Sequence, residues 1–267
     1  MTLPTSITSR DNPLLKRLRV LAQDNTAYRK QGQIWLEGDH LCRALLARGH
    51  RPAIAVFTET GWMHAPHDLR DASDHTVTVP DALMTGISGL ESPASVAFVW
   101  DLPVANGPES GKASVVLDRL QDAGNVGSIL RSAAAFGFGQ VLALKGTAAL
   151  WSPKVVRAGM GAHFGLTLVE GLLADDLASL GVPLILTSSH QGEWLHRCEL
   201  PWPCAWILGH EGQGVSEVLK SSAQRTVRIA QPGGEESLNV AAAAAICLHA
   251  SAAARASGGG SDSLAGL

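Results

Sequence analysis

The sequence contains little charge, few cysteines and no long uninterrupted apolar run. Charged residues make up 17% of its 267 residues, whereas hydrophobic residues make up 46%. This balance excludes a disordered chain and a coiled coil, and it supplies enough apolar side chains for a core. The formal net charge of −3 argues against a protein that coats nucleic acid without specificity.

Signals for membranes and export are also scarce. No apolar run is long enough to span a bilayer, and residues 1–20 lack the apolar core of a signal peptide. We therefore expect a soluble, cytoplasmic protein with no membrane partner.

The four cysteines, Cys42, Cys198, Cys204 and Cys247, form no CxxC pair and no dense disulfide framework. Cys198 and Cys204 lie among three histidines, so a zinc site is one interpretation. Structural zinc sites have tighter paired spacing, however, and we expect scattered cysteines and no bound metal.

Proline, glycine and small polar residues gather at 102–113, LPVANGPESGKA, between two apolar segments, which is typical of a linker. The length fits one large domain or two ordinary ones. We expect a small α/β domain at 1–104, a second domain at 105–255 and a disordered tail at 256–267.

Apolar strands alternate with helices on both sides of this linker. In the first domain the sequence predicts strands at 33–38, 53–58, 76–80 and 95–100, and helices at 39–49 and 81–88. In the second it predicts strands at 114–118, 140–145, 166–170, 183–189, 205–209 and 226–230, and helices at 125–137, 152–161, near 173–180, near 214–220 and in the final alanine-rich stretch. The regular alternation indicates an α/β fold with a parallel sheet covered on both faces.

Positive charge is concentrated near the N-terminus. Residues 1–30 hold six Lys and Arg against two Asp, a local charge of six minus two, or +4. A basic helix that includes Lys16, Arg17 and Arg19 can bind RNA phosphates. A solvated helix face explains the same residues equally well.

Three strand-to-helix junctions of the second domain have unusual compositions, and ligands bind at such junctions in open parallel sheets. The first, 117–139, contains DAGN, a turn with a helix cap, followed by Arg131 on a helix with small neighbours. The small neighbours leave space for a ligand beside the guanidinium. A surface arginine on a well-capped helix is the alternative interpretation.

The second junction, ILGHEGQGV at 207–215, places three glycines around Glu211, and glycine permits close approach of a ligand to the backbone. It matches neither GxGxxG nor a P-loop, so a tight turn is the alternative. The third junction, 229–245, leads through Pro-Gly-Gly to Ser237 and Asn239 at a helix start, where free N–H groups suit a carboxylate or phosphate.

Together the three junctions resemble the SpoU (TrmH) family of RNA 2′-O-ribose methyltransferases. The likeness rests on GNVGSILRSAAAFG, LGHEGQGV and ESLNVAAAAA, in that order. A softer likeness to the family's N-terminal substrate-binding domain rests on SRDNPLLKRLRVL, WLEGDHLCRALL and ALMTGISGLESPASVAFV. Two positions depart from the family pattern: His210 stands where Asn is usual, and Gly159 stands where Ser is common.

The resemblance implies a fold and a cofactor. The family's catalytic half is a parallel sheet with a SPOUT-type deep trefoil knot, here formed by residues from about 183 to 245. S-adenosyl-L-methionine is expected to bind in the knot loops in a bent conformation. The cofactor-binding positions that the resemblance implies are Thr187, Leu208, Gly209, Ile229 and Leu238.

The resemblance also implies five catalytic positions, Asn125, Arg131, Glu211, Ser237 and Asn239, and no metal. We assign Arg131 to the RNA phosphate and the developing alkoxide, because a guanidinium is hard to deprotonate and is a poor base. Asn125 and Asn239 would orient Arg131 and the loops. Glu211 would position the neighbouring loop or pair with Arg131.

Family members pack their knots in pairs, so the resemblance implies a homodimer in which each active site borrows from the partner. It favours rRNA as the substrate, with tRNA as the alternative. Two further readings are a non-catalytic RNA-binding paralogue and a small-molecule ribose methyltransferase. The retained Arg131 and Asn239 argue against the first, and the basic N-terminal helix argues against the second.

Overall fold

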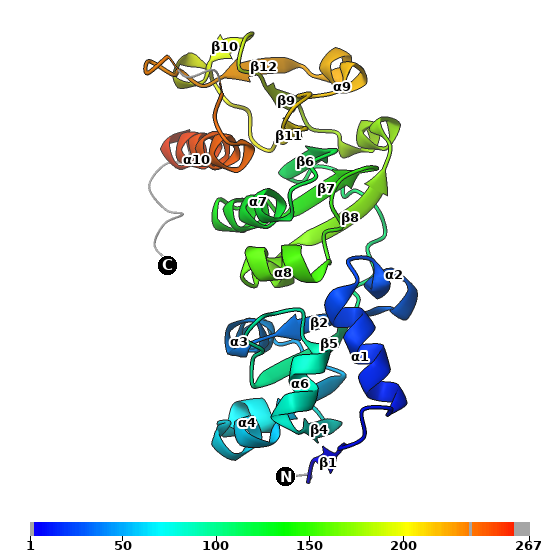
Figure 1. The fold of residues 1–267 in the computed structure, drawn as a ribbon. Coiled ribbons are helices and arrows are strands. Elements are labelled where there is room, and N and C mark those ends of the chain that lie inside the picture. Colours follow the sequence, from blue (N-terminus) through cyan, green and yellow to red (C-terminus); the bar gives the residue numbers. More distant parts are fainter. Residues whose placement is uncertain (1–2, 235–236, 259–267) are drawn as a thin grey trace. The chain divides into compact units, whose positions relative to one another are not determined.

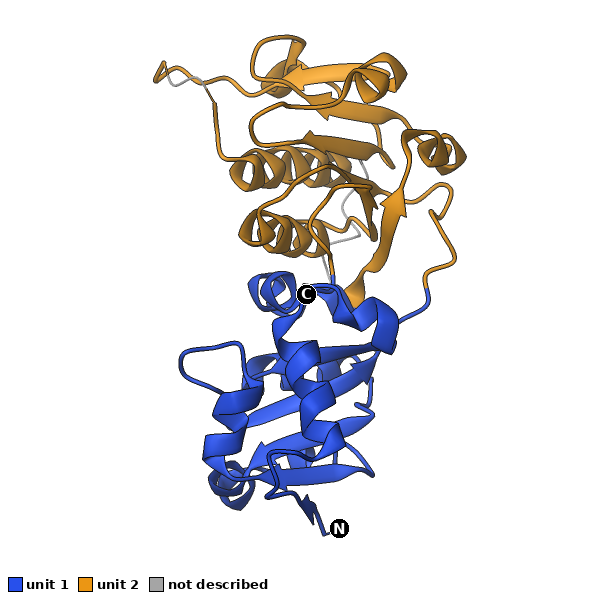
Figure 2. Cartoon of the chain, turned by 45° about the vertical axis from the view of Figure 1, so that its right-hand side comes forward, with its two compact units in different colours: residues 1–104, 151–164 blue, residues 105–150, 165–267 orange. Residues whose placement is uncertain are grey.

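A computed structural model describes residues 3–234 and 237–258 and divides the chain into two compact units (Figure 2). Unit 1 comprises Met1–Val104 and Trp151–Phe164, and unit 2 comprises Ala105–Leu150 and Gly165–Leu267. The segment Trp151–Phe164 therefore groups with the first unit, although the sequence interpretation placed it in the second domain.

Packing explains why this segment groups with unit 1. Helix α8 (Pro153–Gly159) contacts α1 (Pro13–Gln23) and strand β2 (Gln33–Glu37). The ring of Trp100 in β5 lies edge-on to Trp151 and Phe164, with centroid distances of 5.9 and 5.4 Å. Such aromatic contacts are long-range and cannot be read from local patterning.

Unit 1 is built on a five-stranded mixed sheet (Figure 1). Its strand order is β1 (Thr5–Ser6), β4 (Thr76–Val79), β3 (Ile54–Thr58), β5 (Val96–Asp101) and β2. Strands β1, β4 and β3 are parallel, and β5 is antiparallel to β3 and β2. The remaining helices are α2 (Ala27–Gln31), α3 (Asp39–Ala47), α4 (Glu59–His64), α5 (His67–Arg70), α6 (Asp81–Ile87) and the 3₁₀ helix η1 (Ala162–Gly165).

Local chemistry accounts for α1, the basic helix of unit 1. The side chain of Asn12 caps its first turn, and Pro13 occupies the first helical position, where no backbone N–H is needed. Leu15, Leu18 and Leu21 recur every three residues and are buried in the core. The helix therefore buries an apolar face and leaves its basic side chains on the other side.

Unit 2 is built on a seven-stranded sheet in which every strand pair is parallel (Figure 1). The order is β10 (Glu193–Trp194), β12 (Arg225–Arg228), β9 (Leu184–Thr187), β11 (Ala205–Gly209), β6 (Ser114–Asp118), β7 (Gln140–Leu144) and β8 (Thr167–Leu172). Its helices are α7 (Ala123–Ala135), α9 (Glu217–Ser222), α10 (Val240–Gly258) and the 3₁₀ helices η2 (Ala174–Leu180) and η3 (Leu195–Arg197). The predicted α/β fold with a parallel sheet is confirmed.

Helix α10 is longer than the sequence interpretation allowed. It continues to Gly258, so residues 256–258 are helical and not part of the expected disordered tail, because the alanine-rich run keeps its helix propensity to that point. Residues 259–267 of the expected tail lie outside the described residues. The helix lies beside α7 and contacts β11 (Figure 1).

By length and composition alone, Val240–Ser257 of α10 could cross a membrane, with a mean hydropathy of 1.3 over 18 residues. The expectation that no apolar run is long enough to span a bilayer is therefore wrong by this criterion of length and mean hydropathy. Alanine is only weakly apolar, and helices that pack within soluble proteins meet the same criterion. In the structure, α10 packs against α7 and β11 of unit 2.

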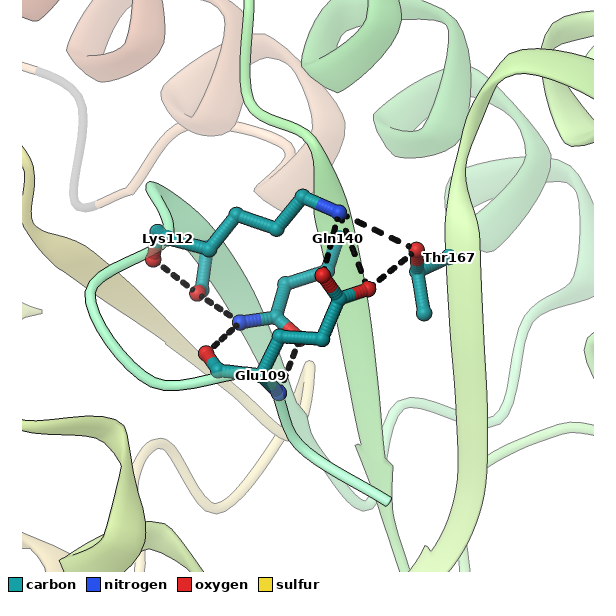
Figure 3. Close-up of polar contacts among 5 residues, drawn as sticks. Glu109, Lys112, Gln140 and Thr167 are labelled. Atoms are coloured by element: carbon teal, nitrogen blue, oxygen red, sulfur yellow. Dashed lines mark hydrogen bonds and ion pairs between the residues drawn. The ribbon is translucent and has the colours of Figure 1, made fainter. Parts of the chain in front are cut away.

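A polar cluster attaches the linker to the amino ends of three strands (Figure 3). Gln140 Nε2 donates to the Glu109 carbonyl and to Ser114 Oγ, both at 2.8 Å, and Thr167 Oγ1 donates to Glu109 Oε1 at 2.7 Å. Lys112 Nζ lies 2.9 Å from the same carboxylate. The hydrogen bonds from Lys112 and Thr167 lower the pKa of Glu109. Ser114, Gln140 and Thr167 each begin a strand, so this cluster lies at the edge opposite the carboxyl ends.

Candidate active site

A cavity of about 330 Å³ lies at the carboxyl ends of β9, β11 and β12 in unit 2. This is the edge at which open parallel sheets bind ligands. Its lining combines strand ends, the loop after β11 and the segment that leads into α10. The lining residues are Thr187, Ser188, Ser189, Gly209, His210, Glu211, Gly214, Val215, Val227, Ile229, Gln231, Ser237, Leu238, Asn239, Val240 and Ala243.

Most of the predicted cofactor positions line this cavity. Thr187 and Gly209 end strands β9 and β11, Ile229 follows β12, and Leu238 precedes α10 with 39% of its surface exposed. Leu208 is fully buried within β11 and is not a lining residue. The sequence interpretation named no contact at Ser188, Ser189, Val227 or Gln231. Ser188, Ser189 and Gln231 lie at the carboxyl ends of predicted strands and could have been found from that position.

Glu211 joins the loop after β11 to the loop after β6. Its carboxylate accepts hydrogen bonds from Asn125 Nδ2 and the backbone N–H of Asp122, both at 3.3 Å, and from the N–H of Gln121 at 3.4 Å. Partial burial acts to raise the pKa of Glu211, but hydrogen bonds from its own N–H, Asn125, Asp122 and Gln121 outweigh burial and lower it. The carboxylate is therefore ionised at neutral pH.

Asn239 extends this network to the third junction. Its Nδ2 donates to Asn125 Oδ1 at 3.0 Å, while its own Oδ1 accepts the N–H groups of Ala241 at 2.9 Å and Ala242 at 3.3 Å. Asn239 is thus both the N-cap of α10 and a bridge to α7. Asp122 caps α7 in the same way, accepting the N–H of Asn125 at 2.7 Å. The three predicted junctions meet at one hydrogen-bonded centre.

The loop after β11 requires glycine at its first position. A Cβ on Gly209 would collide with the backbone of Gly214 and Val215, so a side chain there would displace the loop. His210 shapes the same loop, because its Nδ1 accepts the N–H groups of Gly212 at 3.0 Å and Gln213 at 3.2 Å. An asparagine side-chain oxygen can accept in the same way, which explains how histidine replaces the usual Asn.

Gly159, the second departure from the family pattern, has a packing reason. A Cβ at this position of α8 would collide with the imidazole of His163. A serine would therefore not fit beside the buried His163 side chain.

Asp118, a residue that the sequence interpretation missed, braces the first two junctions. Its side chain is almost fully buried at the end of β6, where Oδ2 accepts the Ser216 N–H at 2.7 Å and Oδ1 accepts Arg119 Nε at 3.0 Å. Arg119 has a φ of 60°, a left-handed conformation that is uncommon for a non-glycine residue. Its NH1 reaches Gln213 Oε1 at 3.1 Å. An acidic residue at the carboxyl end of a buried strand was the available signal.

Arg131 is not among the residues of this cavity. It is exposed on α7 and lines a more open hollow between α7 and α10, which also includes Ser128, Ala241, Ala242 and Ala245. No hydrogen bond or ion pair joins Arg131 to Glu211, Asn125 or Asn239. The expected pairing of Glu211 with Arg131 is absent from the described part of this single chain, and Glu211 holds the loops together instead.

The predicted RNA-binding residues of α1 lie in unit 1. Lys16 is exposed and forms an ion pair with Asp11 at 3.0 Å, which lowers the pKa of that carboxyl group. Arg17 NH1 donates to Gln33 Oε1 at 2.6 Å, and Arg19 Nε donates to the Gly86 carbonyl at 2.7 Å. Both arginines therefore also hold the fold of unit 1.

Metal-binding chemistry is not assembled in the part of the chain that the structure describes. No group of three or more His, Cys, Asp and Glu side chains there could hold a metal ion. Cys42, Cys204 and Cys247 are buried, and burial raises the pKa of Cys204 to about 11 and that of Cys247 to about 12. Such thiols stay protonated at neutral pH and are poor metal ligands.

The fold and cavity define an α/β protein with a cavity at the carboxyl edge of a parallel sheet, the edge at which open parallel sheets bind small ligands. The model of the SpoU rRNA Methylase family matches residues 112–249. An uncharacterized tRNA/rRNA methyltransferase of Synechocystis sp. is 33% identical over 91% of this chain and 92% of that protein. The 23S rRNA (guanosine(2553)-2′-O)-methyltransferase RlmP of Bacillus subtilis is 31% identical over 82% of this chain and 88% of that protein. The chain belongs to the SpoU rRNA methylase family, and the resemblance seen in the three junctions is confirmed.

Solved structures agree with this assignment. The structure of an RNA 2′-O ribose methyltransferase superimposes with a TM-score of 0.77 at 28% identity, covering 94% of this chain and 99% of that one. An AdoMet-bound rRNA methyltransferase from Sinorhizobium meliloti has the same fold, with a TM-score of 0.79 at 24% identity, covering 92% and 97%.

Proposed function

We propose that this chain transfers a methyl group from S-adenosyl-L-methionine to a ribose 2′-hydroxyl of RNA, and that the RNA is ribosomal. The observation that carries the proposal is the cavity at the carboxyl edge, bordered by the hydrogen-bonded side chains of Glu211, Asn125 and Asn239. Membership of the SpoU family supports the reaction. The similarity to RlmP of Bacillus subtilis supports an rRNA substrate.

The residues of the cavity fit S-adenosylmethionine. Ile229, Leu238 and Val215 supply apolar walls for a planar adenine, and the glycine loop at 209–214 lets backbone groups approach the ligand. The volume of about 330 Å³ lies within the range of small-molecule sites, about 300–1,000 Å³. When bound, the cofactor supplies an electrophilic methyl group on a sulfonium.

The side chains of this chain provide positioning and charge. Glu211 and Asn125 hold the first two loops together, and Asn239 fixes the start of α10 against them. Ser237 lines the cavity as a neutral hydrogen-bonding group. The described lining residues include no Lys or Arg, so we assign the positive charge that stabilises a developing alkoxide to a residue outside the cavity.

That charge is supplied in a homodimer by the partner subunit's Arg131. The hollow between α7 and α10, which contains Arg131, is lined by Phe136 and otherwise by Ser and Ala side chains, whose small size permits close approach of a second copy. Ile246, which follows Ala245 in α10, is 41% exposed. The strand order β12-β9-β11-β6 places a later strand between two earlier ones and is consistent with the trefoil knot that we infer for residues from about 183 to 245.

The remaining parts of the proposal concern the substrate and its location. Unit 1 binds RNA, with Lys16 as the most accessible cation of α1 and with Arg17 and Arg19 beside it. The similarity to the bacterial rRNA methyltransferases RlmP and RlmB supports a cytoplasmic location. A tRNA substrate is the alternative within the same chemistry.

The decisive experiment maps 2′-O-methylation across total rRNA and tRNA with and without this protein. We expect one ribose position in rRNA to lose its methyl group. A position lost only from tRNA would transfer the proposal to tRNA. No lost position in either pool would refute the enzymatic function.

Subunit complementation tests the role of Arg131. We expect Arg131→Ala to abolish transfer and to leave the affinity for S-adenosylmethionine within about twofold, because the residue lies outside the cavity. Gly209→Val should disrupt the cofactor loop and also inactivate the enzyme. When the two inactive variants are mixed in equal amounts and re-equilibrated, about half of the dimers contain one subunit of each variant. One of the two sites in such a mixed dimer is intact, so the mixture should regain about a quarter of wild-type activity. No recovery would contradict a shared site.

A further inference from the structure

Two edge strands of unit 2 hold an arginine and a tryptophan face to face. Arg228 of β12 and Trp194 of β10 are partners in the parallel register, and the Arg228 Cζ atom lies 3.6 Å from the centroid of the Trp194 ring. The imidazole of His196 stacks with the same indole at a centroid distance of 6.3 Å. The indole therefore fixes the plane of the guanidinium.

The guanidinium of Arg228 has no acceptor among the described residues. Its Nε is buried without a hydrogen-bond partner. Within residues 3–234 and 237–258, no ion pair or hydrogen bond reaches its other two nitrogens. Arg225, three residues earlier on the same strand, is different: its NH1 donates to the Glu199 carbonyl at 2.7 Å and contacts Cys198 Sγ at 3.3 Å. A planar, stacked arginine with unfilled donors is suited to bidentate binding of an oxyanion.

The backbone is built to bring these two side chains together. Gly192, just before β10, has a φ of 104°, and a Cβ there would collide with the backbone of Thr226 in β12. Only glycine allows the chain to approach β12 this closely and place Trp194 opposite Arg228.

The position next to the cavity indicates which oxyanion binds. Val227 and Ile229, on either side of Arg228, both line the cavity. Successive side chains of a strand point to opposite faces, so Arg228 points away from the face that Val227 presents. A cofactor carboxylate inside the cavity would have to reach around the strand, whereas an RNA strand that crosses this edge places a phosphate beside each nucleotide.

We propose that Arg228, held by Trp194, binds a backbone phosphate of the substrate RNA close to the ribose that is methylated. This subsite rests on the proposed function. Arg228 supplies charge and two parallel N–H donors, and Trp194 acts as a positioning residue that keeps the guanidinium in place.

The test uses the full-length protein with unmodified 16S rRNA, 23S rRNA and tRNA transcribed in vitro. Arg228→Gln removes the charge, Arg228→Lys keeps the charge but removes the planar fork, and Trp194→Leu removes the stacking surface. Arg255→Gln is the matched control, because Arg255 also stacks on an indole of unit 2, that of Trp202 at 4.9 Å, and does not line the cavity. Circular dichroism and thermal unfolding show whether each variant is folded.

For Arg228→Gln we expect the KM for RNA to rise about tenfold, because the charge-assisted contact with one phosphate is lost. The kcat and the Kd for S-adenosylmethionine should stay within about twofold. The slope of log affinity for RNA against log salt concentration should fall by about one, because one phosphate contact is lost. Arg228→Lys should retain most of the salt slope while binding RNA more weakly, and Trp194→Leu should raise the KM for RNA less than Arg228→Gln does.

Three results would overturn the subsite. An RNA KM and salt slope unchanged in Arg228→Gln would remove the phosphate contact. A weakened affinity for S-adenosylmethionine with an unchanged RNA KM would assign the anion to the cofactor carboxylate. An equal loss in Arg255→Gln would show a general charge effect. A wild-type protein that transfers no methyl group to either rRNA or tRNA would instead refute the proposed function, and the subsite with it.

Discussion

Replacing Asp118 with asparagine should destabilise unit 2 and loosen the cofactor loop. The carboxylate is 1% exposed and accepts two hydrogen bonds, from the Ser216 N–H and from Arg119 Nε. Asparagine has only one acceptor oxygen, so either the Ser216 N–H or Arg119 Nε would face the NH₂ group of the asparagine, which is itself a donor. A hydrogen bond to a charged group contributes about 1.5–3 kcal/mol. Arg119 is 35% exposed, so water can replace part of its lost bond, and we expect a loss of about 2 kcal/mol.

This loss is measurable by calorimetry of the full chain. For a unit of this size, 1 kcal/mol shifts the Tm by about 2–4 °C, so the transition of unit 2 should fall by about 4–8 °C. The affinity for S-adenosylmethionine should fall too, because the Ser216 N–H anchors the loop that lines the cavity. The matched control is Asp175→Asn, which changes an exposed carboxylate of the same unit. A Tm within 2 °C of wild type, with unchanged cofactor affinity, would refute the bracing role.

Three further predictions concern the same loops. Asn239→Ala removes the cap of α10 and the bridge to α7. Calorimetry should show that the free energy of unfolding falls by about 1 kcal/mol, and cofactor binding should weaken. An unchanged Tm would contradict the capping role. His210→Asn should keep wild-type affinity for S-adenosylmethionine, because the asparagine oxygen can accept the two loop N–H groups as His210 does. His210→Ala has no acceptor and should weaken that affinity several-fold in titration calorimetry. Equal affinities of the two variants would contradict this role. The pKa of Glu211 is lowered in the folded state, so its contribution is present above the ordinary value of 4.5 and is lost as pH falls through the lower folded value. The Tm difference between wild type and Glu211→Gln should therefore be constant at neutral pH and shrink in acid, and a difference independent of pH would count against it.

Much of the secondary structure follows from local pattern. Ten of the twelve strands that the structure describes were predicted, because they are short and largely apolar runs bounded by turn residues, as in Ser114–Asp118 and Ala205–Gly209. The strands β1 and β10 were not predicted, because each has only two residues; β10 also depends on the close approach of Gly192 to Thr226. The predicted helix near 173–180 is a 3₁₀ helix, which pattern does not distinguish from an α-helix.

The candidate site, too, was predicted from the sequence only in part. The residue types of the three junctions were recognisable, and most of the predicted cofactor positions line one cavity. Asp118 and Gln231 were missed although both stand at the carboxyl end of a predicted strand, because the partner of Asp118 and the cavity beside Gln231 depend on segments far away in the sequence. The separation of Arg131 from the cavity was also hidden, since Arg131 follows Asn125 by less than two helical turns, about 3.6 residues each, and yet faces a different hollow.

By itself, the sequence determined the α/β class, the order of the longer strands and helices and the three junctions, because these depend on periodicity, propensity and capping within short windows. Only the tertiary structure decided that Glu211 binds the amide of Asn125 and not Arg131, that Asp118 anchors Ser216, and that Arg228 rests on Trp194 without an acceptor. Each of these contacts joins segments far apart in the chain. Their existence depends on sheet order and register, which no local pattern contains.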